Sequence, residues 1–400
     1  MAHFVVIGAG QAGQSLCATL RTEGFEGDVT LIGSEPFPPY QRPPLSKGYL
    51  LGEMARERLF LRPEGWYADQ RIDLRLGQPA TDIDTAARTV RVGPETLSYD
   101  QLAITTGLVA RPLPPEMGGD LANVFTIRTL ADIDALTAPL HDAARVVVIG
   151  GGYIGLEAAA VARTLGAEVT VIEAGERILG RVAAAETAAA IRKVHADRGV
   201  TIREGERLER LTGTDAVDGV LLDGGETLAA DLVIVGIGIL PRCQIAADAG
   251  LKADGGVVVD QMGRTSDRFV WAAGDCALFP FRGDLIRLES VQNAIDMGQA
   301  VARNMLGAET AYDPQPWFWS DQYETHLQIA GLNTGYDRVV VRQDGGRSHW
   351  YFCGDDLRAV DAIDDARAYM VGKRLLAAGR PVDPATVADP QTDLKALMRT

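Results

Sequence analysis

The sequence predicts an α/β protein with two Rossmann-like dinucleotide-binding units and a further α+β segment at its C-terminal end. The motif G-x-G-x-x-G occurs twice, beginning at Gly8 and at Gly150, and each copy stands between an apolar run and a helical pattern. The chain changes character after residue 316, where tryptophan-rich and strand-like runs precede a last helical pattern. Its 400 residues are enough for about two to three domains.

The first unit has the order strand, glycine turn, helix, strand. Residues 4–7 are apolar, residues 14–21 have a helical pattern, and residues 29–32 form a second strand-like run. Glycines at this turn let the backbone approach a pyrophosphate, and the N–H groups at the helix start face the phosphates. We therefore expect Gly8, Gly10 and Gly13 to bind a dinucleotide.

The second unit repeats this order with Gly150, Gly152 and Gly155 at its turn. A strand is expected at residues 145–149, a helix at 156–165, and a second strand at 169–172. Two such units in one chain imply two bound dinucleotides.

Glu173 ends the second strand of the second unit. A carboxylate at this place accepts hydrogen bonds from the adenosine ribose and repels a 2′-phosphate, which favours NAD over NADP. Arg177 and Arg181 follow closely and would offer a 2′-phosphate partners, which opposes that preference. In the first unit Gly33 takes the corresponding place and Glu35 comes two residues later, so we expect the loops to hold different dinucleotides.

Charge and cysteine spacing exclude several classes of protein. The net charge of −15 opposes a general nucleic-acid binder. The four cysteines, Cys17, Cys243, Cys276 and Cys353, form no C-x-x-C pair and have no zinc-ligand spacing. The first strand begins by Phe4, and no apolar run reaches the roughly 18 residues of a membrane span, which predicts a cytoplasmic protein.

Two cations and a carboxylate are candidate site residues. Four prolines make residues 37–47 rigid and hold Arg42 and Lys47 near the first glycine turn; alternatively, both are merely exposed cations. Glu157 is expected in the first turn of the second unit's helix. There it would either complement the helix dipole or pair with Lys47, and both interpretations stay open.

The remaining segments give further elements and candidates. A strand ends at Gly107, next to Thr106, and another ends at Gly238, so the backbone there can approach a ligand. Asp275 follows the strand-terminal Gly274. Its carboxylate is either placed to bind a sugar-like hydroxyl chain of a ligand or is part of an ordinary turn. Strand-like runs occupy 59–62, 73–77, 89–92, 326–329, 338–342 and 350–352. A small antiparallel sheet is expected from 200–203, 217–222 and 226–230. One helix is expected to start at a capping box at 129–132, and two others are expected to cover 290–306 and 364–378.

The segments PPYQRPPLSK, IGGGYIGLE, AAGD, ESVQNA and PWFWSDQYE together make the chain resemble the flavoprotein ferredoxin reductases that serve bacterial cytochrome P450 and ring-hydroxylating dioxygenase systems. The wider fold of that family is the glutathione reductase fold. The resemblance covers essentially the whole chain. It implies an FAD-binding domain at 1–112 and 237–316, an NAD-binding domain at 113–236, and a C-terminal α+β domain at 317–400 near the flavin and the ferredoxin interface.

The resemblance also assigns residues to the cofactors. It implies FAD on the first glycine loop, surrounded by Ala12, Ser34 or Glu35, Arg42, Ala80, Arg128, Asp275 and Val291. Lys47 would lie against the isoalloxazine near N5, paired with Glu157. NADH would lie on the second loop, with Tyr153 and Ile154 beside the nicotinamide and Glu173 on the ribose. Trp319 would stand on the side from which electrons leave, although Trp317 and Phe318 are expected to be core.

The implied activity is the transfer of a hydride from NADH to FAD, followed by one-electron transfers to a [2Fe–2S] ferredoxin that feeds a cytochrome P450 or a ring-hydroxylating oxygenase. The helix at 290–306 and Lys47 would stabilise the negative charge of the reduced flavin. Residues 36–47 contain no cysteine, which opposes thiol chemistry beside the flavin. Since such ferredoxins are acidic, docking needs a local basic patch. The candidates for this patch are Arg62, Arg303, Lys373 and Arg374. Alternatively, these residues are only solvated surface cations.

Other functions on the same fold stay open. A rubredoxin reductase, an NADH oxidase or a monodehydroascorbate reductase would differ mainly at the acceptor surface. A flavoprotein like apoptosis-inducing factor, which acts by binding macromolecules in its NADH-bound form, is an alternative of another class. The acidic charge balance opposes it.

Overall fold

The computed structural model describes residues 1–398 and divides into two compact units. The first unit comprises Met1–Gln41, Ala55–Val109 and Ile239–Pro314, and the second comprises Arg42–Met54, Ala110–Gly238 and the chain from Gln315 onward. Each unit is therefore assembled from segments that are far apart in the sequence. The three-domain division expected from the sequence is finer than this one and stays a prediction.

The first unit is built on a parallel sheet with strand order β19-β7-β1-β2-β3. Sheets of this kind are covered on both faces, so their strands are almost continuously apolar. The strands are β1 (His3–Ile7), β2 (Asp28–Ile32), β3 (Ile72–Arg75), β7 (Gln101–Ile104) and β19 (Val270–Ala272).

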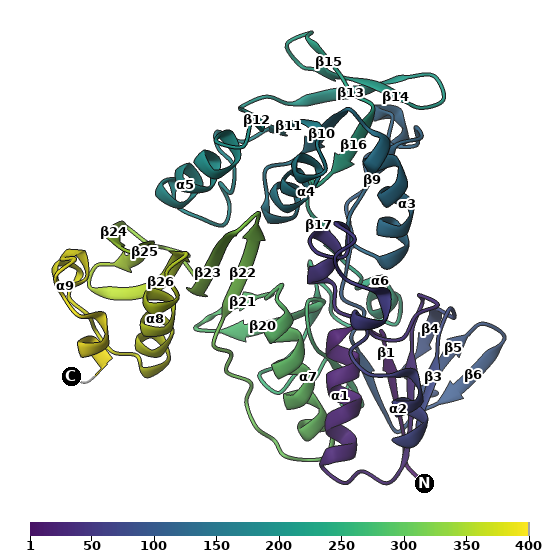
Figure 1. Cartoon of the computed structure of the whole chain (residues 1–400). Helices are drawn as coiled ribbons and strands as arrows, with labels where there is room; N and C mark the ends of the chain where they lie inside the picture. The colour runs from purple at the N-terminus through teal and green to yellow at the C-terminus, as the bar shows by residue number, and fades with distance from the viewer. Residues whose placement is uncertain (399–400) are drawn as a thin grey trace. The chain divides into compact units, whose positions relative to one another are not determined.

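Helices α1 (Gln11–Thr22) and α7 (Val291–Met305) lie side by side in this unit (Figure 1). They approach closely because Gly298 has no side chain: a Cβ there would lie 2.7 Å from the carbonyl oxygen of Ala12. The helix expected at 290–306 is confirmed, and its N-cap is Ser290, whose hydroxyl accepts a hydrogen bond from the Asn293 N–H.

The rest of the first unit consists of short elements. Residues 59–62, expected as a strand, form no strand, and within them only Phe60 makes an isolated bridge. Leu59 caps one short helix and Pro63 caps the next, which leaves too little chain for a strand. The short elements of the first unit are η2 (Arg56–Arg58), α2 (Glu64–Asp69), β4 (Ala80–Asp84), β5 (Thr89–Val92), β6 (Glu95–Ser98), β17 (Ile239–Pro241), α6 (Gln244–Asp248), β18 (Val257–Val258), β20 (Ala277–Phe281) and β21 (Asp284–Ile286). Strand β8 (Leu108–Ala110) begins in the first unit, and its last residue belongs to the second.

The second unit contains another parallel sheet, with strand order β12-β11-β10-β16-β9. Its helices include α3, whose capping box between Thr129 and Asp132 is confirmed. The elements are η1 (Pro43–Ser46), η3 (Pro115–Met117), β9 (Val124–Phe125), α3 (Leu130–Asp142), β10 (Arg145–Ile149), α4 (Tyr153–Thr164), β11 (Glu168–Glu173), α5 (Ala185–Ala196), β12 (Thr201–Glu204) and β16 (Leu232–Val235).

The expected antiparallel sheet is partly wrong. Of the expected strand at 200–203, residues 201–203 belong to β12, which pairs in parallel with β11, and not to the small sheet. The first strand of that sheet is instead β13 (Leu208–Gly213), which pairs with β14 (Val217–Leu222), and β15 (Thr227–Ala229) completes it. The charged residues of β13 and its register shifts obscure the strand pattern in the sequence.

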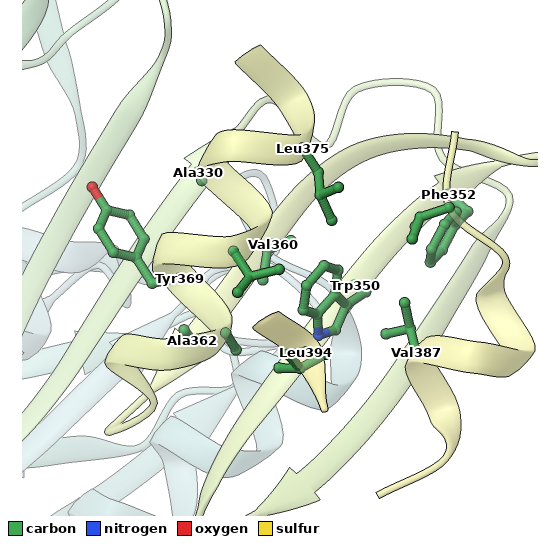
Figure 2. Packing of buried hydrophobic residues seen from close by; sticks show 12 residues of the cluster. Ala330, Trp350, Phe352, Val360, Ala362, Tyr369, Leu375, Val387 and Leu394 are labelled. Atoms are coloured by element: carbon green, nitrogen blue, oxygen red, sulfur yellow. The ribbon is translucent and has the colours of Figure 1, made fainter. Parts of the chain in front are cut away.

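The C-terminal part of the second unit is an antiparallel sheet in the order β22-β23-β26-β25-β24. Its hydrophobic core surrounds Trp350, which is fully buried and lies among Val360, Val387 and Leu394 (Figure 2). The elements are β22 (Trp317–Gln322), β23 (Thr325–Gly331), β24 (Arg338–Asp344), β25 (Gly346–Cys353), β26 (Asp356–Ile363), α8 (Ala366–Ala378), α9 (Pro384–Ala388) and η4 (Leu394–Met398). None of the helices between residues 1 and 398 combines the length and the hydrophobicity of a membrane span.

A buried polar cluster joins α5 to strands β25 and β26. The Thr187 hydroxyl donates to Asp361 Oδ2 at 2.7 Å and lies 2.7 Å from His349 Nδ1, and the Tyr351 hydroxyl also donates to Asp361. Burial raises the pKa of Asp361 from 3.8 to about 6. Burial, helped by the charge of Arg347, lowers the pKa of His349 from 6.5 to about 4.

Replacing Trp350 by Ala is expected to lower the free energy of unfolding by about 3–5 kcal/mol, because the change leaves a large cavity. The matched control is Val341→Ala on β24 of the same sheet, where the side chain is 40% exposed. Chemical denaturation of both variants measures the difference. A loss for Trp350→Ala no greater than that of the control would contradict the packing described.

The buried cluster predicts opposing pH dependences. The raised pKa of Asp361 contributes stability that is full below pH 3.8 and is lost as the pH rises through about 6. The lowered pKa of His349 contributes stability that is full above pH 6.5 and is lost as the pH falls through about 4. In the wild type the two slopes largely cancel between these limits.

Replacing either Asp361 or His349 should reveal the pH dependence of stability that the other residue contributes. Asp361→Asn should leave a protein that loses stability on acidification below pH 6.5, with a slope of up to about 1.4 kcal/mol per pH unit. His349→Gln should instead lose stability as the pH rises through the same range. Urea unfolding as a function of pH measures both slopes, and two variants with the wild-type slope would refute the titration of this cluster.

Candidate active site

The glycine turn after β1 is shaped by close backbone approach. Gly8 has φ +116°, and a Cβ there would lie 2.2 Å from the carbonyl oxygen of Thr105. A Cβ at Gly13 would lie 2.1 Å from the carbonyl oxygen of Gly8. A Cβ at Gly10, in contrast, would meet no atom of the described chain within 4 Å. The turn is therefore packed on its inner side and open at Gly10, where α1 begins, which suits a dinucleotide pyrophosphate.

The turn after β10 has the same construction. Gly150 has φ +109°, and a Cβ there would lie 2.4 Å from the carbonyl oxygen of Gly236. A Cβ at Gly155 would lie 2.1 Å from the carbonyl oxygen of Gly150, whereas one at Gly152 would meet no described atom within 4 Å. This second turn is open in the same way at the start of α4. Each unit thus presents one surface that fits a dinucleotide.

Helix α4 begins earlier than expected, at Tyr153 instead of residue 156. Glu157 is therefore its fifth residue, and the expectation that it lies in the first turn is wrong. The prediction counted the last glycine of the motif as loop, although Gly155 is helical. Because the effect of the helix dipole is confined to the first turn, the dipole does not explain why a carboxylate stands at position 157.

Glu157 is instead the centre of a buried ion pair. The residue is 2% exposed, and its Oε2 accepts a bond from Lys47 Nζ at 2.7 Å. Ser46 donates to the same oxygen at 2.6 Å, and Ser320 donates to Oε1 at 2.7 Å. A buried carboxylate needs such donors, because its charge has lost the surrounding water. The structure thus shows Lys47 and Glu157 as partners.

The segment that carries Lys47 is held at both ends. The prolines of η1 fix its backbone, Arg42 precedes it, and Lys47 follows it. The Arg42 guanidinium donates to the carbonyl oxygen of Arg128 at 2.7 Å. Lys47 Nζ also lies 3.5 Å from the carbonyl oxygen of Pro43, and its side chain is 19% exposed. An ammonium has three donors, so within residues 1–398 one N–H of Lys47 is available to a bound group.

The expected nicotinamide side of the second unit lies at the start of α4. Tyr153 and Ile154 are the first two residues of this helix. Ile154 is 45% exposed, so its apolar side chain is accessible beside the open turn. The buried Tyr153 hydroxyl has no hydrogen-bond partner within the described chain.

Glu173 lies directly beside the second glycine turn. Its Oε2 accepts from the Gly151 N–H at 2.8 Å, and its Oε1 accepts from the Gly175 N–H at 2.6 Å. These bonds fix the carboxylate at the end of β11. The nearby Arg177 has a buried Nη1 without a hydrogen-bond partner in residues 1–398. Of the three side chains weighed for the NAD preference, Glu173 is thus held at the turn, and Arg177 lies four residues after it in the sequence.

In the first unit, Arg242 joins several expected site residues, and sequence reasoning missed it. Thr106 donates to its carbonyl oxygen at 2.6 Å, its N–H donates to Gly107 at 2.9 Å, and its guanidinium lies 3.3 Å from Ser34 Oγ. Its place shortly after a strand ending in glycine was the available signal. Glu35 accepts a bond from Tyr40 at 2.5 Å.

The other expected flavin contacts occupy turns and element starts. A Cβ at Gly274, the residue before Asp275, would lie 2.8 Å from the Cβ of Ala12, so the end of the β19 segment lies against α1. Ala80 begins β4 and Val291 begins α7. In the second unit, Gly238 has φ +115° shortly after β16. These placements leave the cofactor contacts themselves as predictions.

Trp319 lies on β22, the edge strand of the C-terminal sheet. Its ring centroid is 5.5 Å from that of Trp317, and Lys373 Nζ lies 4.6 Å from the Trp317 ring centroid. Trp317 and Phe318 are partly buried and pack against buried hydrophobic clusters, so the expectation that they are core holds only in part.

The cysteines form no disulfide within residues 1–398. All four are free thiols in the described chain. Burial raises the pKa of Cys17 to about 12 and also raises that of Cys276, so neither forms the reactive thiolate readily. Within residues 1–398, no group of three or more His, Cys, Asp and Glu residues is arranged to hold a metal ion.

Comparisons with known proteins agree with this geometry. Residues 2–298 match the family described as pyridine nucleotide-disulphide oxidoreductase, and residues 317–398 match the family described as reductase C-terminal. The chain is 42% identical to rhodocoxin reductase of Rhodococcus erythropolis over 398 residues, covering 98% of this chain and 93% of the relative.

Two solved structures are similar over the whole chain, each at 37% identity, a TM-score of 0.96 and 100% coverage of this chain. One is the ferredoxin reductase for the CYP199A2 system from Rhodopseudomonas palustris, covered over 100% of its length, and the other is a covalent putidaredoxin reductase–putidaredoxin complex, covered over 98%. The expected fold is confirmed. The chain belongs to the pyridine nucleotide-disulphide oxidoreductase family and is an FAD-dependent oxidoreductase that uses a pyridine nucleotide.

Proposed function

We propose that the protein is an NADH-dependent ferredoxin reductase that passes electrons from NADH through FAD to a [2Fe–2S] ferredoxin. That ferredoxin would feed a cytochrome P450 or a ring-hydroxylating oxygenase. The observation that carries the proposal is the pair of open glycine turns, each built to receive one dinucleotide. Reductases that act in such systems are similar to this chain over nearly all of its length.

Bound FAD would supply the step between the two-electron chemistry of NADH and the one-electron chemistry of an iron–sulfur cluster. The chain would supply binding and electrostatics. The N-terminus of α7 carries the partial positive charge of the helix dipole, and Lys47 offers an ammonium held by Glu157. We assign both to the stabilisation of negative charge on the reduced cofactor.

The thiols support direct transfer to the iron–sulfur protein. Enzymes that relay electrons through a disulfide need two neighbouring reactive cysteines. The described cysteines are unpaired, and Cys17 and Cys276 are fully buried. We therefore propose that electrons leave without a thiol intermediate, on the side marked by Trp319. The free thiols also support the proposed cytoplasmic location.

An acidic ferredoxin requires cationic groups on a chain of net charge −15. Of the four expected docking residues, Lys373 lies over the rings of Trp317 and Tyr369, at 4.6 and 5.8 Å from their centroids. Arg374 follows it on α8. In the other unit, Arg303 pairs with Glu23, and Arg62 lies over the Trp66 ring. We assign docking first to Lys373 and Arg374, because they share the C-terminal segment with Trp319.

The direct test is NADH-dependent reduction of cytochrome c by the purified flavoprotein, with and without a [2Fe–2S] ferredoxin and, in parallel, with a rubredoxin. We expect rapid reduction only when the [2Fe–2S] protein is present. A rate that appears only with rubredoxin would instead establish a rubredoxin reductase. A flavin that NADH bleaches and that neither iron protein reoxidises would overturn the proposed function.

The nucleotide preference is tested at Glu173. Glu173→Gln keeps the size of the side chain and removes the charge that repels a 2′-phosphate. We expect the ratio of kcat/KM for NADH to that for NADPH to fall by roughly 10-fold, since a lost charge contact of about 1.4 kcal/mol corresponds to that factor. The matched control is Glu176→Gln, at an exposed position three residues further along. An unchanged ratio would remove Glu173 from nucleotide selection.

A further inference from the structure

Strand β22 presents two different faces. Side chains alternate along a strand, so Ser320 and Gln322 point to the face opposite Trp319. Ser320 is fully buried and Gln322 is 1% exposed. Two polar side chains in such a place need fixed hydrogen-bond partners.

A continuous chain of hydrogen bonds connects these residues to the buried ion pair. Ser320 Oγ lies 2.7 Å from Glu157 Oε1, and Gln322 Nε2 lies 3.1 Å from Ser320 Oγ. His195 Nε2, on α5, lies 2.8 Å from Gln322 Oε1. The chain therefore links α5 and β22 to the carboxylate on α4 that binds Lys47.

The direction of every bond in this chain follows from the carboxylate. An ionised Glu157 only accepts, so Ser320 must donate its single hydroxyl proton to it. Ser320 Oγ must then accept from the Gln322 amide nitrogen, which turns the amide oxygen toward His195. His195 Nε2 must consequently carry a proton. Its Nδ1 is buried with no partner in residues 1–398, which disfavours a second proton on the ring, and burial lowers the pKa of His195.

We propose that Ser320 and Gln322, fixed by the Nε2–H tautomer of His195, are positioning residues for the Lys47 ammonium. The proposal rests on the proposed function, in which Lys47 acts during NADH oxidation. Lys47 and Ser46 both bind Oε2 of Glu157, whereas Oε1 has Ser320 as its donor. Without Ser320, Oε1 would be a buried acceptor without that donor, and the carboxylate would turn toward other donors. Lys47 would then lose its fixed counterion.

The role of the chain is geometric and not proton transfer. The carboxamide of Gln322 stands between His195 and Ser320 and uses its oxygen and its nitrogen in one direction only. A carboxamide is neither an acid nor a base near neutral pH, so it interrupts a proton path. The neighbouring residue Trp319 faces the other side of the same strand. One strand thus holds the Lys47–Glu157 pair and carries the aromatic residue assigned to electron exit.

The kinetic test uses the flavin-loaded protein without ferredoxin. Flavin bleaching by NADH is followed by anaerobic stopped-flow absorbance in Ser320→Ala and Gln322→Leu. We expect the rate at saturating NADH to fall by roughly 10- to 100-fold, with little change in the Kd for NADH, because displaced catalytic groups slow the reaction more than they weaken binding. The matched control is Ser348→Ala in the same sheet, where the hydroxyl that is removed accepts from Trp350 Nε1 and belongs to the core around Trp350 instead of the Glu157 chain.

A second variant tests the direction of the bonds. In Gln322→Glu, the ionised carboxylate cannot donate to Ser320, whereas the protonated carboxyl can replace the amide donor. We expect flavin reduction to recover as the pH falls through the pKa of the introduced carboxyl, with no such change in the wild type. Among residues 1–398, the ionisable groups that face this position or its partners include Glu157 on α4, His195 on α5, Tyr323 after β22, Lys47 after η1 and Arg198 after α5.

A structural readout is independent of turnover. In ¹⁵N NMR of histidine-labelled flavoprotein, His195 should show a protonated Nε2 and an unprotonated Nδ1, and Gln322→Leu should abolish this single-tautomer signal. The opposite tautomer, or wild-type bleaching rates in flavin-loaded Ser320→Ala and Gln322→Leu, would overturn the positioning role. Failure of the wild type to reduce any ferredoxin would overturn the proposed function alone, because bleaching by NADH needs no ferredoxin.

Discussion

The carboxylate of Glu157 is the constraint on which the arrangement of the second unit depends. Glu157 is 2% exposed. Its hydrogen-bond donors are Ser46, Lys47 and Ser320, which come from two segments that are far from α4 in the sequence. A buried ion pair adds little net stability, yet loss of one partner costs about 3–5 kcal/mol. The pair therefore specifies where these segments lie relative to α4 more than it stabilises the unit.

Features that depend on neighbouring residues could be predicted from the sequence. The glycine turns, the capping box of α3 and the long helix α7 each follow from a local pattern of residue types. The sequence pattern predicts too late a start for α4, because a glycine-rich run indicates a loop, although Gly155 lies within the helix. The sheet membership of β12 was also wrong, because strand pairing depends on which distant strand is adjacent.

The polar network around Glu157 shows why a site cannot be completed from sequence. Ser320 is 163 positions from Glu157, and His195 is 127 positions from Gln322. Their residue types carry no motif, and only the fold brings them together. The sequence allows Glu157 either to pair with Lys47 or to complement the helix dipole, and it does not distinguish between these two roles. Arg242 was missed for a different reason: its contacts to Thr106 and Gly107 use its backbone groups, so its residue type does not reveal them.

The central claim is that electrons pass from NADH through the flavin to a [2Fe–2S] protein without a thiol. Its most direct measurement is an anaerobic titration of the flavoprotein and excess ferredoxin with NADH, before and after alkylation of the accessible thiols. We expect each NADH to reduce two ferredoxin molecules, since a hydride carries two electrons and a [2Fe–2S] cluster accepts one, and alkylation should leave this ratio and the rate unchanged. Loss of ferredoxin reduction on alkylation, with flavin bleaching intact, would contradict the account.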